Sequence, residues 1–223
     1  MITKLLGIYK KKLGAVEIYE LMSACSRQLV FKEFLCGING KDVNLKTDLP
    51  VWVGNPKVGA QHRIMVVGEA PHDRRPQVNM ARIQNTHFGA IFAAMHWRKK
   101  GPFEDKICQV YPKAFADLLK MAGQKKIFVL FTDLYKTVDA HKEDKPTGNE
   151  ELWKTFMLKE IKIVQPHVVI ALGKKVCCKL NDWHVENVMY VRHPAQGGVV
   201  IAKKQICQIL RSIFASNKSK RAK

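Results

Sequence analysis

RIMVVGEAPH, residues 63–72, is the stretch of sequence that decides the fold. Its run of apolar and β-branched residues, 64–67, predicts a buried strand, and Gly68 and Pro71 predict a turn directly after that strand. The turn delivers Glu69 to the carboxyl end of the strand, where open α/β sheets bind their ligands. Glu69 is therefore a candidate functional residue. The alternative is an ordinary strand followed by a polar turn, in which Glu69 accepts hydrogen bonds from backbone N–H groups.

VMYVRHPAQGG, residues 188–198, repeats this arrangement far downstream. An apolar strand again ends in a polar group, His193, followed by a proline and then by a glycine pair. If the two strands are parallel, their carboxyl ends meet at the same edge of the sheet, and we expect Glu69 and His193 to face one cleft there. The alternative for His193 is a histidine that only caps the end of its strand.

Strands and helices alternate along the rest of the chain. Apolar runs predict strands at residues 63–68, 126–132, 167–172 and 188–191. Apolar residues that recur at three and four predict helices at 5–34 (one or two), 87–99, 111–122, 149–164, 174–180 and 199–215. Segments rich in polar residues, glycine and proline predict that residues 37–56 are mostly loop and that 72–86 and 138–148 are loops. This alternation predicts a three-layer α/β/α fold with a mostly parallel central sheet.

The length of 223 residues is enough for one well-buried domain, and no internal boundary is strong enough to argue for two. We expect an N-terminal helical segment at about residues 1–36 and a basic C-terminal tail at about 217–223. No apolar run approaches the roughly 20 residues that a membrane span needs, so we expect no membrane partner. We expect a cytoplasmic monomer, associated with the nucleoid if the source is bacterial or archaeal.

The chain is strongly basic. It has 38 Lys and Arg residues against 19 Asp and Glu residues, a formal net charge of +19. Cationic side chains release condensed counterions from a phosphate backbone, so this excess favours DNA as the partner. The alternative is a solvated basic surface that keeps the protein soluble.

Four segments, in the same order along residues 51–207, resemble the uracil-DNA glycosylase superfamily. They are most similar to its iron–sulfur branch, often called family 4. VGNPKVGAQHRIMVVGEAPH, residues 53–72, resembles that branch's run of VGNP, strand and GEAPG. RHPA, residues 192–195, stands where the branch has HPS.

The other two segments lie between these. FVLFTDLYKT, residues 128–137, resembles the branch's strand that ends in TNVVKC. EELWKTFMLKEIKIVQPHVVIALGKKVCCKL, residues 150–180, resembles its succession of helix, P-x-V-I-V-A-L-G and helix. Since four segments match in register, the resemblance implies the superfamily's α/β/α fold and an activity on bases in DNA.

The resemblance assigns catalytic roles to Glu69 and His193. Glu69 occupies the place of the glutamate in GEAPG, which implies that it handles the attacking water; its charge can also offset positive charge that develops on the sugar. His193 occupies the place of the histidine in HPS. A neutral imidazole there can donate one hydrogen bond to a base oxygen that gains negative charge.

The residues that we expect to bind the substrate are Gly68, Ala70, Pro71, His72, Phe88 and Asp133. Asp133 aligns with the family's base-reading asparagine, but an ionised Asp only accepts hydrogen bonds, which puts specificity for uracil in doubt. His72 replaces the final glycine of GEAPG and adds an imidazole beside the turn. Phe88, in THFGA, is the candidate aromatic for stacking on the base; the alternative is a core phenylalanine.

The segment around the second strand end is expected to lie near the DNA. Its residues are Arg192, Gln196, Gly197 and Gly198. The glycine pair lacks side chains and so permits close approach of a backbone.

The cysteines depart from the iron–sulfur branch. A cluster needs four thiolates brought together. The branch's C-x-x-C pair falls on Cys25 and Gln28 here, and its third cysteine falls on Thr137. We therefore expect no cluster, no other metal and no cofactor, and we expect the six cysteines to be reduced thiols.

These features together predict a DNA base-excision repair enzyme. It would be a monofunctional DNA glycosylase that hydrolyses the N-glycosidic bond of uracil or another deaminated base, acting on the DNA backbone and a flipped base. No motif places a lysine at the site, so a Schiff-base lyase step is not expected. One alternative is a non-catalytic nucleic-acid-binding member of the same fold; another is an α/β hydrolase or transferase of small molecules.

Overall fold

The computed structural model describes residues 45–47, 51–54, 62–70, 106–124, 126–135, 137–139, 145–146 and 150–220. The expected N-terminal helical segment, the loop at 72–86 and the helix at 87–99 lie outside the described residues, as do Pro71, His72 and Phe88.

The central sheet has five strands in the order β2-β4-β3-β7-β8. Their bounds are β2 Val51–Val53, β3 His62–Gly68, β4 Ile127–Asp133, β7 Val168–Leu172 and β8 Val188–Val191. The strands β4, β3, β7 and β8 run parallel, and only β2 pairs antiparallel, with β4. The predicted parallel strands are confirmed. Their long apolar runs arise because a strand in such a sheet is covered on both faces.

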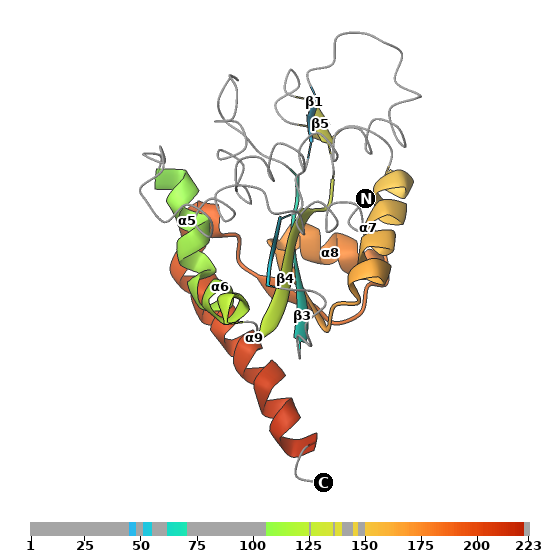
Figure 1. Ribbon diagram of the computed structural model, residues 1–223. Coiled ribbons are helices and arrows are strands. Elements are labelled where there is room, and N and C mark those ends of the chain that lie inside the picture. The colour runs from blue at the N-terminus through green and yellow to red at the C-terminus, as the bar shows by residue number, and fades with distance from the viewer. Residues whose placement is uncertain are drawn as a thin grey trace, which may run out of the picture.

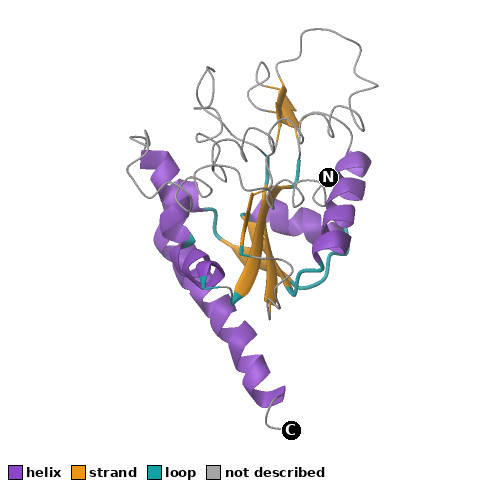
Figure 2. Ribbon diagram, in the orientation of Figure 1, coloured by secondary structure: helices purple, strands orange, loops and turns teal. Residues whose placement is uncertain are grey.

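Helices cover both faces of the sheet (Figure 1). The bounds of those on one face are α5 Lys106–Ala114, α6 Ala116–Gly123 and α9 Val199–Lys220. Those on the other face are α7 Glu150–Val164 and α8 Lys174–Asp182. Coloured by secondary structure, the domain shows the sheet between two helix layers (Figure 2), which confirms the predicted three-layer α/β/α fold.

Three short strands form a second sheet that the sequence did not predict. They are β1 Leu45–Thr47, β5 Thr137–Asp139 and β6 Lys145–Pro146, in the order β1-β5-β6. Within residues 37–56, for which we predict mostly loop, β1 and β2 are strands, and the prediction of a loop at 138–148 is wrong for residues 138–139 and 145–146. Strands of two or three residues are too short to show a period of two, and their pairing joins segments that are distant in sequence.

The single helix predicted at 111–122 is two helices, with a break at Phe115 (φ −99°, ψ 9°). The backbone hydrogen bonds continue across the break, because Phe115 N donates to Tyr111 O at 3.0 Å and Leu119 N donates to Phe115 O at 2.9 Å. Phe115 is fully buried, and its ring packs edge-on against Phe131 of β4 with 5.3 Å between centroids. This contact with the sheet fixes the backbone where local helix propensity predicts no break.

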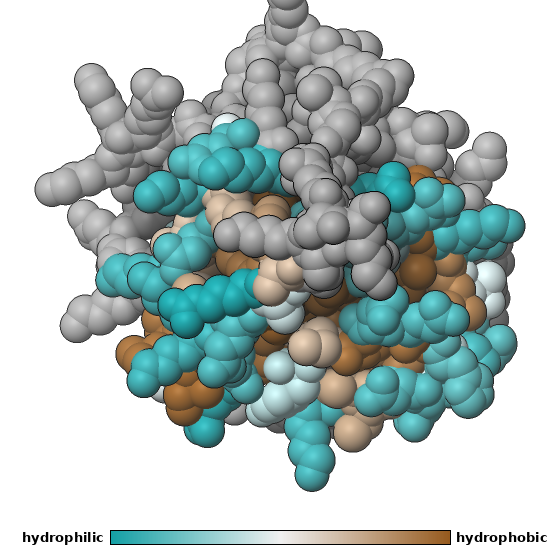
Figure 3. Space-filling model, turned by 90° about the horizontal axis from the view of Figure 1, so that it is seen from below, coloured by the Kyte–Doolittle hydropathy of each residue, from teal (hydrophilic) through white to brown (hydrophobic). Residues whose placement is uncertain are grey.

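The last helix, α9, reaches Lys220 and so includes residues 217–220 of the expected basic tail. The apolar side of α9 packs on the sheet layer through Ala202, Ile206 and Ile209. Seen from the amino-terminal end of the parallel strands, the surface carries many hydrophilic side chains with hydrophobic residues between them (Figure 3).

Candidate functional site

The carboxyl ends of the parallel strands form one edge of the sheet, which we call the carboxyl edge. Gly68 pairs with Asp133 in the register of β3 and β4, so Glu69 leaves β3 beside the end of β4. His193 follows β8, and β7 lies between β8 and β3. Glu69, Asp133 and His193 therefore share the carboxyl edge, at the upper end of the sheet in Figure 1.

Glu69 is held in a turn that continues from β3. Leu134 N donates to Gly68 O, and Tyr135 N donates to Glu69 O, each at 2.9 Å. These bonds fix the backbone of Glu69 against the segment that follows β4. The side-chain carboxylate takes no part in these backbone bonds. Within the described part of the chain, it accepts a hydrogen bond from Lys175 Nζ.

Lys175 is a site residue that the sequence analysis missed. It lies in the first turn of α8, and its side chain is 66% exposed while that of Glu69 is 39% exposed. The hydrogen bond to Glu69 raises the pKa of Lys175, against the opposing effect of partial burial. The available clue was the Gly-Lys-Lys sequence after β7, since the start of α8 must also lie at the carboxyl edge.

Tyr111 of α5 connects two other candidate residues. Its side chain is 3% exposed, and its hydroxyl lies 3.1 Å from Nε2 of His193. The two rings meet edge-on, with 5.9 Å between centroids. Burial raises the pKa of Tyr111, and the nearby charge of Asp133 raises this pKa further. The sequence pattern predicts only that Tyr111 lies in a helix; the clue to more was a phenol on an otherwise apolar helix face.

Asp133 is 2% exposed and belongs to the same side of the sheet as Tyr111. Successive residues of a strand point to opposite faces. Phe131 packs on Phe115, in the layer of α5, whereas Thr132 donates its hydroxyl to Glu160 of α7 at 3.2 Å. Asp133, two residues after Phe131, returns to the α5 side.

The candidate residues at the carboxyl edge thus contact both helix layers. Asp133 and His193 come together around Tyr111 on the α5 side, while Glu69 bonds α8 on the other side (Figure 1). The prediction that Glu69 and His193 face one cleft stays a prediction, because residues 71–100 lie outside the described part of the chain.

The glycine pair is required by the turn that carries His193. Residues Pro194–Gly198 form one π-helical turn, and His193 is its N-terminal cap residue. Gly197 has a φ of +68°, which favours glycine. A Cβ on Gly198 would lie 2.3 Å from His193 O, so only glycine fits there. The backbone conformation and close contacts of this turn are therefore enough to explain the Gly197-Gly198 pair, and no approach of DNA is needed to explain it.

The backbone of Arg192 is held by a hydrogen bond, whereas its side chain is exposed to solvent. Its N–H donates to Oε1 of Gln205 in α9 at 2.8 Å, which ties the end of β8 to that helix. The side chain of Gln196 is outside the described residues. The side chain of Arg192 is exposed at the carboxyl edge.

A basic groove runs over the layer of α5, α6 and α9, next to the turn after His193. It encloses about 630 Å³ and has apolar walls that include Ala116 and the 65% exposed Val200. Its cationic side chains are Lys113, Lys203, Lys204 and Arg211. None of the catalytic or substrate-binding candidates lines it.

The described cysteines do not fit an iron–sulfur cluster. Cys177 and Cys178 lie on α8, where Cys177 Sγ accepts a weak hydrogen bond from Asn181. Cys207 lies on α9 in the opposite layer, with its thiol 3.2 Å from Asp117 Oδ2. Four thiolates must converge to hold such a cluster. Among the described residues, no group of three or more metal-binding side chains gathers anywhere.

Comparison with known proteins identifies the family. The model of the Uracil DNA glycosylase superfamily matches residues 56–207, more than half of the chain. A comparison with curated proteins gave no match. None of the helices in the described ranges is both long and apolar enough to cross a membrane. The matched region includes Glu69, Asp133 and His193, and the chain belongs to the uracil DNA glycosylase superfamily.

Proposed function

We propose that this protein is a monofunctional DNA glycosylase that hydrolyses the N-glycosidic bond of uracil or another deaminated base in DNA. Membership of the superfamily supports a glycosylase-type function, because enzymes of this superfamily act on DNA. The observation that carries the proposal is the position of Glu69 and His193 at the carboxyl edge of one parallel sheet. Ligands of open α/β folds bind at this edge.

Glu69 is the residue that we propose to bind and orient the attacking water. Bond cleavage requires the nucleotide to leave the base stack and enter a pocket, where water attacks the sugar. A carboxylate can accept a hydrogen bond from that water and can offset positive charge on the sugar. The hydrogen bond from Lys175 restricts the orientation of this carboxylate, and fixed orientation is a main source of rate enhancement.

His193 is the proposed donor to the departing base. The leaving base gains negative charge on its carbonyl oxygen, and a neutral imidazole stabilises this charge with one hydrogen bond. Asp133 is the proposed base-reading group on the same side of the sheet. A carboxylate accepts hydrogen bonds only, so it favours a base edge that presents N–H groups.

The presence of Lys175 at the carboxyl edge does not support a lyase step through a Schiff base. A Schiff base requires a neutral amine as nucleophile, whereas the hydrogen bond with Glu69 raises the pKa of Lys175 and keeps its amine protonated. This supports simple hydrolysis, in which the products are the free base and an intact strand with an abasic site.

The DNA backbone is expected to follow the cationic surface near the turn after His193. Arg192 is exposed there, and the basic groove begins at Val199, directly after the turn. The net charge of +19 supports a strong, salt-dependent contribution from phosphate contacts.

A non-catalytic nucleic-acid-binding protein is the second candidate. One observation favours it: both catalytic candidates already have protein partners. Lys175 bonds the carboxylate of Glu69, and Tyr111 bonds Nε2 of His193. Catalysis through His193 Nε2 requires the base to take the place of the Tyr111 hydroxyl.

An oligonucleotide panel separates the two candidates. Single- and double-stranded oligonucleotides that contain uracil, hypoxanthine, xanthine or mismatches are incubated with purified protein and scored for abasic sites. The control is a Glu69→Gln, His193→Ala double variant purified in the same way, which reveals any contaminating glycosylase. Release of one of these bases by the unaltered protein alone supports the glycosylase. Tight, salt-sensitive binding without release supports the non-catalytic protein.

A further inference from the structure

The basic groove follows one side of α9, where this helix meets α5 and α6. The residues of α9 that line it, from Val199 to Arg211, recur at three and four along the helix and so share one side. The opposite side of α9 carries Ala202, Ile206 and Ile209, which are buried against the sheet layer. The groove is therefore a surface feature of this helix layer and is separate from the core.

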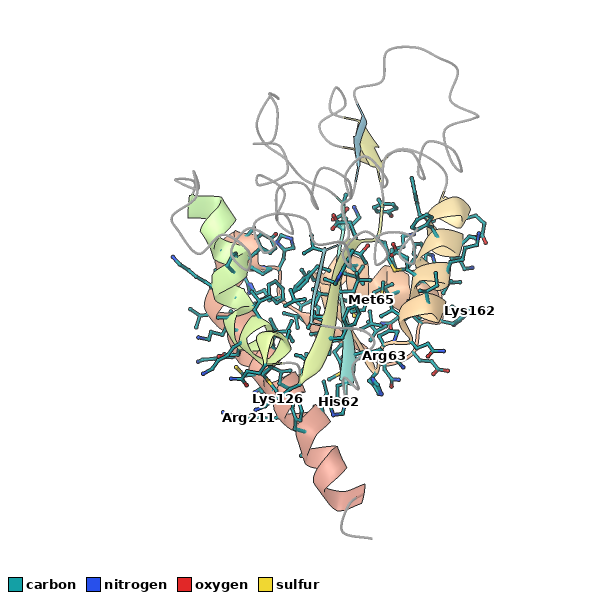
Figure 4. All side chains as sticks on the ribbon, in the orientation of Figure 1. His62, Arg63, Met65, Lys126, Lys162 and Arg211 are labelled. Carbon is teal, nitrogen blue, oxygen red and sulfur yellow. The ribbon has the colours of Figure 1, made fainter. Side chains whose placement is uncertain are left out.

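Most of the basic groove lies away from the carboxyl edge. Val199 directly follows the turn after His193, and the part of α9 from there to Arg211 spans about 18 Å. Figure 4 shows Arg211 level with Lys126 and His62, at the end of the sheet where β3 and β4 begin. DNA bound at the carboxyl edge therefore leaves most of the groove open.

The basic groove carries an excess of positive charge. No acidic side chain is among the described residues that line it, whereas Lys113, Lys203, Lys204 and Arg211 all do. Asp117, beside the groove, lies 3.9 Å from the ammonium of Lys203. Within the described ranges, Lys204 and Arg211 form no ion pair. This charge favours an anionic occupant.

The apolar walls of the groove favour a peptide over a nucleic acid. Val199 and Cys207 line it beside the 65% exposed Val200, and the neighbouring Ile201 is 43% exposed. Exposed apolar side chains that lie together are typical of sites where another protein binds. Phosphates do not bury such side chains. Grooves for single-stranded nucleic acid carry aromatic residues on which bases stack, and none is among the described residues that line this groove.

We propose that the basic groove docks an acidic amphipathic helix of a partner protein. Its apolar side chains would cover Val199 and Val200, and its carboxylates would face Lys203, Lys204 and Arg211. A length of about 18 Å holds about three helical turns, enough for anchors at i, i+3, i+4 and i+7. A second copy of this chain, with its net charge of +19, does not supply the negative charge.

This inference goes beyond the proposed function, because it adds a partner other than DNA. The partner would bind to the side of the domain while the carboxyl edge stays open. The protein could then hold DNA and the partner at the same time.

A peptide display library tests the proposal on the full chain. Its peptides are about 12–15 residues long, with Glu or Asp at fixed positions and random residues at i, i+3, i+4 and i+7. We expect the protein to enrich peptides with apolar residues at the random positions. A Lys204→Glu, Arg211→Glu variant should bind the enriched peptides at least about tenfold more weakly. Val200→Ser should bind them about fivefold more weakly, since less apolar area is buried.

The matched controls lie on α7, in the opposite helix layer (Figure 4). Lys159→Glu, Lys162→Glu makes the same change in charge at exposed positions, and Ile163→Ser removes a side chain that is 47% exposed. Both should bind the peptides nearly as well as the unaltered protein.

Three results would overturn the proposal. One is a library from which the protein enriches no peptide. Another is a set of enriched peptides whose affinity falls as much in the α7 variants as in the groove variants. The third is displacement of the peptides by undamaged duplex, which would assign the groove to DNA. No base release is measured, so a protein without glycosylase activity can pass this test and an active glycosylase can fail it.

Discussion

The ammonium of Lys175 hydrogen-bonds the carboxylate of Glu69 and joins the first turn of α8 to the end of β3. This contact brings a cation from one helix layer to the carboxylate that the sequence singles out. The orientation of Glu69 therefore depends on Lys175, to which no sequence motif assigns a role.

Lys175→Met should slow base release by about 10- to 100-fold, because a carboxylate that loses its partner samples unproductive orientations. The change should appear in kcat, with KM for the oligonucleotide nearly unaltered. Lys174→Met removes the same charge from the neighbouring exposed position and is the control. Equal losses in the two variants would show that general charge, and not the contact with Glu69, matters.

Glu69→Gln and His193→Ala should each reduce base release by about 10²-fold or more, the usual scale for loss of one well-placed stabilising group. Neither residue is proposed to hold the backbone, so affinity for undamaged duplex should stay nearly constant. Single-turnover kinetics and binding titrations measure the two effects separately. A large loss of binding in both variants would contradict the proposed division of roles.

Arg192→Ala should weaken DNA binding for all sequences and reduce the slope of log affinity against log salt by about 1, since one phosphate contact is lost. Lys162→Ala is the matched control. Lys162 lies in the last turn of α7, towards the amino-terminal end of the parallel strands (Figure 4). A slope that changes as much in the Lys162 variant would place the DNA elsewhere.

Stability should fall as the pH drops below 6.5, because of His62. Burial, and secondarily the charge of His167, lower the pKa of His62 from its ordinary value of 6.5. His167 Nδ1 also accepts a hydrogen bond from Arg63 N at 3.0 Å, at the lower end of the sheet in Figure 4. The unfolded chain therefore binds the proton more readily than the folded one, so acid favours unfolding until the pH passes below the folded pKa.

Denaturant titrations at several pH values check this. The free energy of unfolding of the unaltered protein should decrease with falling pH, and His62→Gln should flatten that decrease. His184→Gln, at an exposed position, should leave it unchanged. A pH dependence that is the same with and without His62 would contradict the assignment.

Gly198→Ala should destabilise the protein by about 1–3 kcal/mol, because the added Cβ meets His193 O at 2.3 Å and the turn must shift. Gly123→Ala is the control: nothing lies within 4 Å of its Cβ position, and alanine should stabilise by up to about 1 kcal/mol. Thermal unfolding of both variants measures the contrast.

The sequence predicted the parts of the fold that local pattern determines. The apolar runs of β3, β4, β7 and β8 identify strands covered on both faces, and the 3.6-residue pattern identifies α7 almost to the residue. The break at Phe115 and the three-residue strands β1 and β2 were not predicted. Tertiary contacts determine these features, and a short sequence window does not contain such contacts.

The residues of the candidate site also fall into two groups, those that the sequence predicted and those that it did not. Glu69 and His193 were found because each stands at the end of an apolar strand, and the structure has both at the carboxyl edge. Lys175 and Tyr111 were missed because they come from helices, and only the packing of those helices on the sheet brings them to the site.

The most direct test of the central claim is a single-turnover assay of base release. The claim is that Glu69 and His193 form one hydrolytic site. The best substrate of the oligonucleotide panel is incubated with excess protein, and both the free base and the uncut abasic strand are quantified. We predict equal amounts of the two products from the unaltered protein and at least about a 10²-fold slower reaction for the Glu69→Gln, His193→Ala double variant. Release of base at the same rate by the double variant, or no release from any oligonucleotide that the protein binds, would contradict it.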